Sequence, residues 1–282
     1  MTSTHDAGPQ RIVCLTEETT ETLYLLGEEH RIVGISGFTY RPLRARREKP
    51  RVSAFTSANI GKILELRPDL VLGFSDLQAD IGRELCKRGV PVHLFNQRSV
   101  AEILQAVRLT GALVGRGEEA DALANKLGAG LARHVEAAAS LPRRPRMFFE
   151  EWHEPLISGI RWCSELMELV GGVDVCVESR ASQGAQGRIF PPEEVARRDP
   201  EGVVASWCGR KAKPEKIRGR PGWAEVQAVK DDQLYEIKSA IILQPGPAAL
   251  TEGVDQLARI VAAVARGERL GHPREGDLRS VS

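Results

Sequence analysis

The chain has 282 residues, which is enough for one large or two medium domains. Hydrophobic residues make up 42% and charged residues 27% of it, the balance of an ordinary globular protein. The net charge of +1 argues against a protein built to attract nucleic acid, and no apolar run approaches the roughly 20 residues that span a bilayer.

The chain starts MTSTHDAGPQ, without the basic and apolar regions of a secretory signal. We therefore expect a cytoplasmic protein that is not inserted in a membrane. There are five cysteines, and their odd number and wide spacing favour reduced thiols over a disulfide framework.

Short apolar runs alternate with amphipathic stretches in the first part of the chain. The apolar runs predict buried strands, and glycine or proline marks where several of the helices end. We expect strands at 11–15, 31–35, 70–74 and 90–95, and helices at 18–27, 59–66, 77–88 and 100–114. This alternation favours a parallel sheet with helices on both faces.

One long helical pattern rich in Ala, Leu and Glu follows, from 118 to about 140, and the alternation then restarts. Further strands are expected at 146–150, 202–206 and 233–237, and helices at 163–169 and 252–265. The predicted organisation is an α/β lobe at 1–115, a linking helix at 116–142, a second α/β lobe at 143–270 and a frayed tail at 271–282.

An internal echo supports two similar halves. When the sequence is shifted by 132 residues, 63–72 lies over 195–204, and in both a short helix ends at a proline and leads into a β-branched strand. The same order occurs in many α/β proteins, so a chance match is the alternative.

Ligands of open parallel sheets bind beyond the carboxyl ends of the strands. The residues at these places that we assign to a ligand are Thr16, Glu17, Phe38, Tyr40, Arg41, Glu151, Trp152, Arg161, Trp162, Trp207, Cys208 and Gln244. Three of the four tryptophans are among them, which suits a bulky, partly apolar ligand. The alternative is that these tryptophans fill the interface between the lobes.

This placement predicts a role for each kind of side chain. We expect Trp152, Trp162 and Trp207 to line one wall of a cleft and Phe38 and Tyr40 the other. Glu17 and Glu151 would orient polar groups of the ligand, while Arg41 and Arg161 would hold an anionic arm.

Metal, enzymatic and nucleic-acid functions are the alternatives. The histidines are scattered and no CxxC occurs, so we assign no metal ligand, although Cys163, Cys208, Glu150, Glu151 and His153 could converge. The pairs Glu17–Glu18 and Glu150–Glu151 could serve catalysis, but adjacent residues of an extended segment point in opposite directions. The basic runs at 41–51 and 210–220 are typical of solvated loops, with capture of an anionic ligand second.

Five segments carry a resemblance to a known family. They are RIVCLTEETTETLYLLG, NIGKILELRPDLVLGF, SELMELVGG, AEVQAVKDDQLYEI and LQPGPAAL, and together they resemble landmark segments of class III periplasmic binding proteins. The resemblance implies two Rossmann-like lobes with mainly parallel sheets, joined by one long α-helix, with a ligand cleft between them. Members are not enzymes. They bind cobalamin, ferric siderophores, haem or metal ions and deliver them to the permease of an ABC importer.

The segments FEEWHEPLISGIRW and SWCGRK resemble a cobalamin-binding subgroup, which implies cobalamin or a related corrinoid as the ligand. A siderophore, haem or a metal ion is the alternative, and an enzyme using cleft Cys and Glu residues is another. Transporters of the family usually present one acidic residue per lobe to the permease. Glu193 fits that position in the second lobe, but the first has Gly61, which argues against the usual docking.

Overall fold

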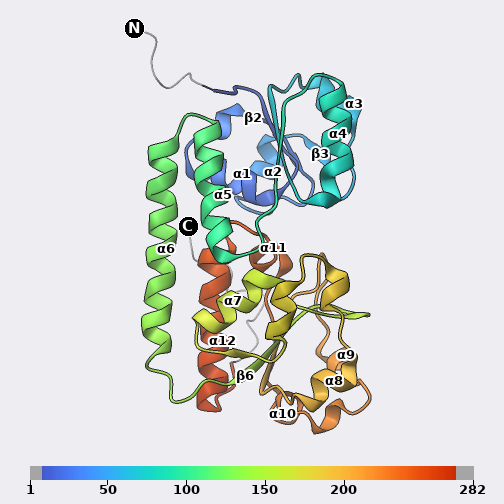
Figure 1. Ribbon diagram of the computed structural model, residues 1–282, viewed down its shortest axis with the longest axis vertical. Helices are drawn as coiled ribbons and strands as arrows, with labels where there is room; N and C mark the ends of the chain where they lie inside the picture. Colours follow the sequence, from blue (N-terminus) through green and yellow to red (C-terminus); the bar gives the residue numbers. More distant parts are fainter. Residues whose placement is uncertain (1–7, 271–282) are drawn as a thin grey trace.

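The computed structural model describes residues 8–270 and has two α/β lobes, one above the other in Figure 1. The N-terminal lobe holds a parallel five-stranded sheet in the order β3-β2-β1-β4-β5. Its strands are β1 (Ile12–Cys14), β2 (Ile32–Ser36), β3 (Arg51–Ser53), β4 (Leu70–Phe74) and β5 (Val92–Phe95). Its helices are α1 (Glu17–Leu25), α2 (Ala45–Glu48), α3 (Ile60–Glu65), α4 (Ala79–Lys87) and α5 (Val100–Leu113), with 3-10 turns η2 (Glu29–Arg31) and η3 (Asp76–Gln78).

The C-terminal lobe holds a sheet in the order β10-β9-β6-β7, with β8 also paired to β6. Only the β6–β7 pair is antiparallel among the described strands. The strands are β6 (Arg146–His153), β7 (Leu156–Ser158), β8 (Val173–Asp174), β9 (Gly202–Ala205) and β10 (Leu234–Glu236). The helices are α7 (Arg161–Leu169), α8 (Pro192–Arg197), α9 (Pro214–Arg218), α10 (Gln227–Lys230), α11 (Ser239–Ile242) and α12 (Val254–Arg266). Between them lie η4 (Val177–Ala181), η5 (Ala185–Arg188), η6 (Trp223–Glu225) and the π-helical turn η7 (Ala249–Gly253).

Helix α6 (Gly117–Ala138) runs beside both lobes and joins them (Figure 1). Its 22 residues span roughly 33 Å, the length of a small domain. It packs very closely on α5, where a Cβ at Gly111 would collide with that of Ala120. The predicted fold of two parallel-sheet lobes and one long helix is confirmed. The domain limits at 115 and 142 stay a prediction, and the predicted tail lies outside the described residues.

The internal echo is real in three dimensions. Helices α3 and α8 occupy equivalent positions 132 residues apart, and each is followed by a residue of left-handed backbone, Arg67 with φ 47° and Asp199 with φ 46°. A proline and then β4 or β9 come next in both lobes. The two lobes therefore carry the same helix-to-strand unit, and a chance match remains the alternative.

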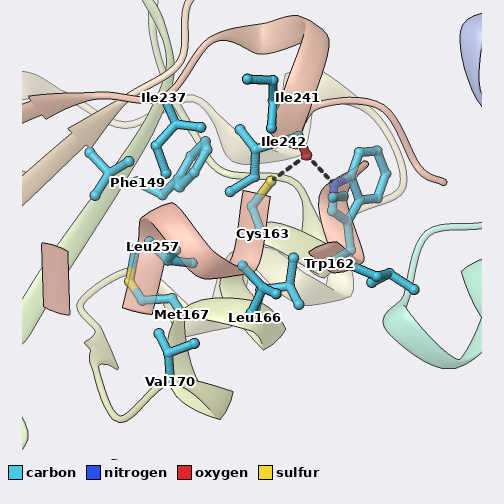
Figure 2. Packing of buried hydrophobic residues seen from close by; sticks show 14 of the residues in the cluster. Phe149, Trp162, Cys163, Leu166, Met167, Val170, Ile237, Ile241, Ile242 and Leu257 are labelled. Carbon is cyan, nitrogen blue, oxygen red and sulfur yellow. Dashed lines mark hydrogen bonds between the residues drawn. The ribbon is translucent and has the colours of Figure 1, made fainter. Parts of the chain in front are cut away.

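The largest apolar core lies under α7 and α12 in the C-terminal lobe. Figure 2 shows Trp162 and Cys163 of α7 pointing inward beside Ile242, with Leu166, Met167 and Leu257 around them. The indole Nε1 of Trp162 donates a hydrogen bond to the Ile242 carbonyl at 2.9 Å. Trp162 thus connects α7 to the end of α11.

The sequence missed several short elements, notably β3 and β7. Strand β3 begins at Arg51, the last residue of the basic run 41–51, and has a single buried residue, so its sequence does not reveal that it pairs with β2. Strand β7 has only three residues and gains its place by pairing back on β6. Neither segment is long enough to show an alternating pattern.

Candidate ligand site between the lobes

The carboxyl ends of the two sheets meet at the junction between the lobes. Helix α1 begins at Glu17, just after β1, and the loop 244–248 of the other lobe packs on it. Gln244 Nε2 donates to Glu17 Oε1 at 3.1 Å, and Gln97 Nε2 donates to the Pro245 carbonyl at 2.9 Å. A Cβ at Gly246 would overlap the Glu18 side chain and lie 3.1 Å from its Cα. Only glycine permits this approach.

Arg41 forms an ion pair between the lobes and is therefore not free to bind an anionic group of a ligand. Its Nε lies 2.9 Å from Glu21 Oε1 in its own lobe, and its Nη1 pairs with Glu252 of the other lobe. Glu21 also accepts from the Ala248 amide at 3.0 Å. Arg161 likewise pairs with Glu165 at 2.7 Å. Both arginines that the sequence assigned to an anionic arm therefore already hold carboxylates.

Three glutamates crowd the first turns of α1. Burial raises the pKa of Glu17 to about 7 and, together with the neighbouring charge of Glu17, that of Glu18 to about 8. Burial also raises the pKa of Glu21, although Arg41 opposes the effect. Thr16 donates to Glu18 Oε1 at 2.7 Å. Glu18 is therefore largely protonated at neutral pH and can sit in the joint without a cation.

The enclosed space at this joint is water-sized. A cavity of about 10 Å³ lies between α1, α5 and the loop 244–248, next to Glu18, Thr22, Gln97 and Thr110. The Gln97 Oε1 atom is buried without a hydrogen-bond partner among the described residues. One water would fit the cavity and could satisfy that oxygen. The cavity is too small for a bulky ligand.

The predicted tryptophan wall is wrong for two of its three members. Trp162 and Trp207 are each only 2% exposed. The Trp207 indole donates to Glu150 Oε1 at 2.9 Å and stacks on His153 with ring centroids 4.2 Å apart. Their rings turn into the core because apolar neighbours and buried acceptors meet them there. Trp152 alone is half-exposed, with Arg210 over its ring at 5.4 Å.

Exposed apolar side chains gather after the strands instead. Phe38 and Leu43 follow β2 and are 52% and 60% exposed, and Leu77 follows β4 and is 54% exposed. Tyr40 of the same segment is half-buried. In the other lobe, Ile189 is 38% exposed. Apolar side chains exposed after the strands of the N-terminal sheet are what a partly apolar ligand requires.

Cys208 and Glu151 lie at the same junction. Cys208 is exposed, yet partial shielding raises the pKa of its thiol and the charges of Glu151 and Glu17, one from each lobe, raise it further. Glu151 is held by Arg188, whose Nη1 and Nη2 donate to its two oxygens at 2.6 and 3.0 Å. Arg188 was not among the expected site residues, because no local pattern in the sequence distinguishes it.

A match between most of the chain and a family model decides the family. Residues 12–241 match the model of the periplasmic binding proteins. The chain belongs to this family. Its sequence is 26% identical over 260 residues to an uncharacterized ABC transporter substrate-binding lipoprotein of Bacillus subtilis, covering 90% of this chain and 80% of the relative. It is also 26% identical over 254 residues to a vitamin B12-binding protein of Vibrio cholerae, covering 88% and 87%.

Solved structures agree with this fold. A periplasmic haem-binding protein from Roseiflexus has a TM-score of 0.79 at 18% identity, covering 92% of this chain and all of the other. The vitamin B12-binding protein of Vibrio cholerae has a TM-score of 0.72 at 24% identity, covering 92% and 98%. The chain has parallel-sheet lobes joined by one long helix, which places it in class III of the periplasmic binding proteins.

Metal ligands and a reactive thiol are the features that the alternative functions require. Within 8–270, no group of three or more His, Cys, Asp or Glu side chains is arranged to hold a metal ion. Burial raises the pKa of the Cys163 thiol well above its ordinary value, and the thiol points to the Ile242 carbonyl (Figure 2). Such a thiol is not an activated nucleophile.

No helix in this part of the chain is long and apolar enough to cross a membrane.

The basic runs of the sequence are not simply solvated loops. Arg220 is largely buried and donates from both Nη atoms to the two oxygens of Glu150 at 2.7 Å. Arg44 pairs with Glu29 at 2.8 Å. These arginines stabilise the lobes through carboxylates distant in the sequence, which the run itself cannot reveal.

Proposed function

We propose that this protein binds a corrinoid such as cobalamin at the junction between its lobes, over the exposed side chains that follow β2 and β4. The observation that carries the proposal is the exposure of Phe38, Leu43 and Leu77 in the segments that follow β2 and β4 of the N-terminal sheet. A broad macrocycle with amide arms matches apolar surface flanked by polar groups. The vitamin B12-binding relatives support the same ligand class. Haem or a ferric siderophore is the second candidate, supported by the haem-binding structural relatives.

Phe38→Ala should weaken cyanocobalamin binding about tenfold or more. An exposed ring that stacks on the macrocycle contributes on the order of 1 kcal/mol beyond its buried area, and 1.4 kcal/mol is a factor of ten. Titration followed by calorimetry and visible absorbance, with haem and a ferric siderophore in parallel, measures the effect.

Leu25→Ala is the matched control, because Leu25 is 53% exposed but ends α1 away from the junction. No saturable corrinoid binding at micromolar concentration would overturn the corrinoid proposal. An unchanged dissociation constant in Phe38→Ala would show that the corrinoid does not bind at Phe38.

We also propose that importer docking is one-sided. Gly61 and Glu193 are exposed and occupy equivalent positions of α3 and α8, 132 residues apart. At this position only the C-terminal lobe thus carries a carboxylate, although Glu65 is exposed at the end of α3. Gly61→Glu should strengthen capture by a corrinoid importer roughly three- to tenfold at low salt, the effect of about 1 kcal/mol from one exposed ion pair.

The measurement is the importer's dissociation constant at two salt concentrations, with Lys62→Glu on the same helix as control. Equal capture by the wild type and Gly61→Glu would show that docking does not depend on this position. The expected cytoplasmic location stays a prediction.

A further inference from the structure

Two arginines, one from each lobe, have an unsatisfied buried donor. Arg98 follows β5 in the N-terminal lobe, and Arg188 ends η5 in the other. Their side chains are only 13% and 3% exposed. The Nε atom of each is buried and has no hydrogen-bond partner among residues 8–270. A buried donor of this kind destabilises the fold unless something accepts a hydrogen bond from it.

Both side chains lie near the first turn of α7. The loop that carries Arg98 is anchored there, because the Val100 amide donates to Glu165 Oε2 at 2.8 Å. Glu151, which Arg188 grips with both Nη atoms, accepts from the Ile160 amide at 3.1 Å, at the N-cap of the same helix. Arg98 and Arg188 are thereby brought together from opposite lobes.

Their electrostatics agree with this placement. The pKa of Arg98 is lowered, and burial makes the largest contribution. The positive charge of Arg188 lowers it further, against the opposing charges of Asp76 and Glu151. Asp76 lies 3.6 Å from Arg98 Nη2 but is 84% exposed, so water screens it. Glu151 is already shared between Arg188 and the Ile160 amide. Both Nη atoms of Arg188 are thus used, by Glu151 and the Ser158 carbonyl, and only its Nε is left to donate to an anion. The Arg98 guanidinium makes no hydrogen bond to a carboxylate among the described residues and is the principal donor available to an anion.

The guanidinium of Arg98 is also held in place before any ligand arrives. It lies over the Phe74 ring at 4.8 Å, and its Nη2 donates to Asn96 Oδ1 at 3.0 Å. None of its other nitrogens donates to a residue that the structure describes. A planar fork fixed in this way is suited to a phosphate or carboxylate oxygen.

We propose that Arg98 and Arg188 form an anion subsite across the lobe junction, which takes a phosphodiester or carboxylate group of the bound ligand. As a ligand subsite it rests on the proposed function. As an anion site it stands by itself. It takes the role that we expected of Arg41 and Arg161, because both of those guanidinium groups are paired with carboxylates whereas that of Arg98 donates only to Asn96.

Inorganic phosphate tests the subsite without any assumption about the ligand. In arginine side-chain ¹H–¹⁵N spectra of the full chain, phosphate should shift the Nε–H signals of Arg98 and Arg188 saturably and leave that of Arg161 in place. The signals are assigned with Arg98→Ala and Arg161→Ala. If phosphate at millimolar concentration moves neither signal, or moves all three alike, the subsite does not exist.

A pair of corrinoids tests its use by the ligand. Cyanocobalamin carries a phosphodiester and dicyanocobinamide lacks it. Arg98→Ala should weaken the first about tenfold to a hundredfold, the range for a charge-assisted hydrogen bond, and leave the second unchanged. Arg161→Ala, a partly exposed arginine of the same junction, should affect neither. Haem and its dimethyl ester form the equivalent carboxylate pair.

The outcomes separate the two proposals. Equal weakening of both corrinoids by Arg98→Ala would assign Arg98 a structural role and overturn the subsite as a ligand site. If the wild type binds neither corrinoid nor haem, the proposed function fails, while the phosphate titration still decides whether the anion subsite exists.

Discussion

Trp207→Ala is expected to lower the free energy of unfolding by about 3–5 kcal/mol, the usual cost of truncating a core tryptophan. Trp207 is 2% exposed and packs in a cluster with Phe148, Val203 and Trp223. Its loss leaves a cavity and removes one donor from the fully buried carboxylate of Glu150. Urea denaturation followed by circular dichroism measures the change.

Two variants separate these contributions. Trp207→Phe keeps most of the ring volume and should lose only about 1–3 kcal/mol, the cost of one missing donor to a buried acceptor. Trp152→Ala, at a half-exposed position on the neighbouring strand, should change stability much less. If Trp207→Ala unfolds at the wild-type urea concentration but loses ligand binding, the tryptophan lines the ligand site and its assignment to the core is wrong.

Glu18→Gln is expected to make the protein more stable above pH 8 by several kcal/mol and to change little below pH 5. Burial raises the pKa of Glu18 to about 8 in the folded state, against an ordinary value of 4.5. Below 4.5 both states are protonated and the carboxyl costs nothing. Between 4.5 and about 8 only the unfolded state loses its proton, so stability falls by up to about 1.4 kcal/mol per pH unit. Above 8 the loss stays constant.

Gln keeps the oxygen that accepts from Thr16 and removes the charge, so its unfolding free energy should lack this slope. Because Glu17 interacts with Glu18, the measured window belongs to the pair. Urea midpoints from pH 5 to 9 at constant ionic strength provide the measurement, and Glu193→Gln, at an exposed position, is the control. Parallel pH profiles for the wild type and Glu18→Gln would contradict a buried, protonated Glu18.

The elements that position the site follow from local sequence. The residues IVCL that follow Arg11 are all apolar because β1 is covered on both faces, and the three strand residues are fully buried. Proline sets the end of α3 and α8, and the 132-residue echo carries through to matching left-handed residues. Periodicity and turn chemistry act over a few residues, so one sequence suffices to read them.

The site itself was only partly predictable for the same reason. Trp152 and Trp207 both lie at the carboxyl ends of strands, yet one is half-exposed and the other is core. Which way a ring turns depends on what the rest of the lobe offers, here the Glu150 carboxylate and the His153 ring. No local pattern encodes that direction.

Composition, periodicity and family-like segments by themselves determined two parallel-sheet lobes and a long linking helix, whereas the junction as the place for a ligand stays a prediction. Only the tertiary structure decided which charges remain available there. Arg41 is neutralised by Glu252, which lies 211 residues away in the sequence, whereas Arg98 and Arg188 keep unpaired donors. An ion pair depends on distance in space between buried groups, and that distance exists only after both lobes have folded and docked.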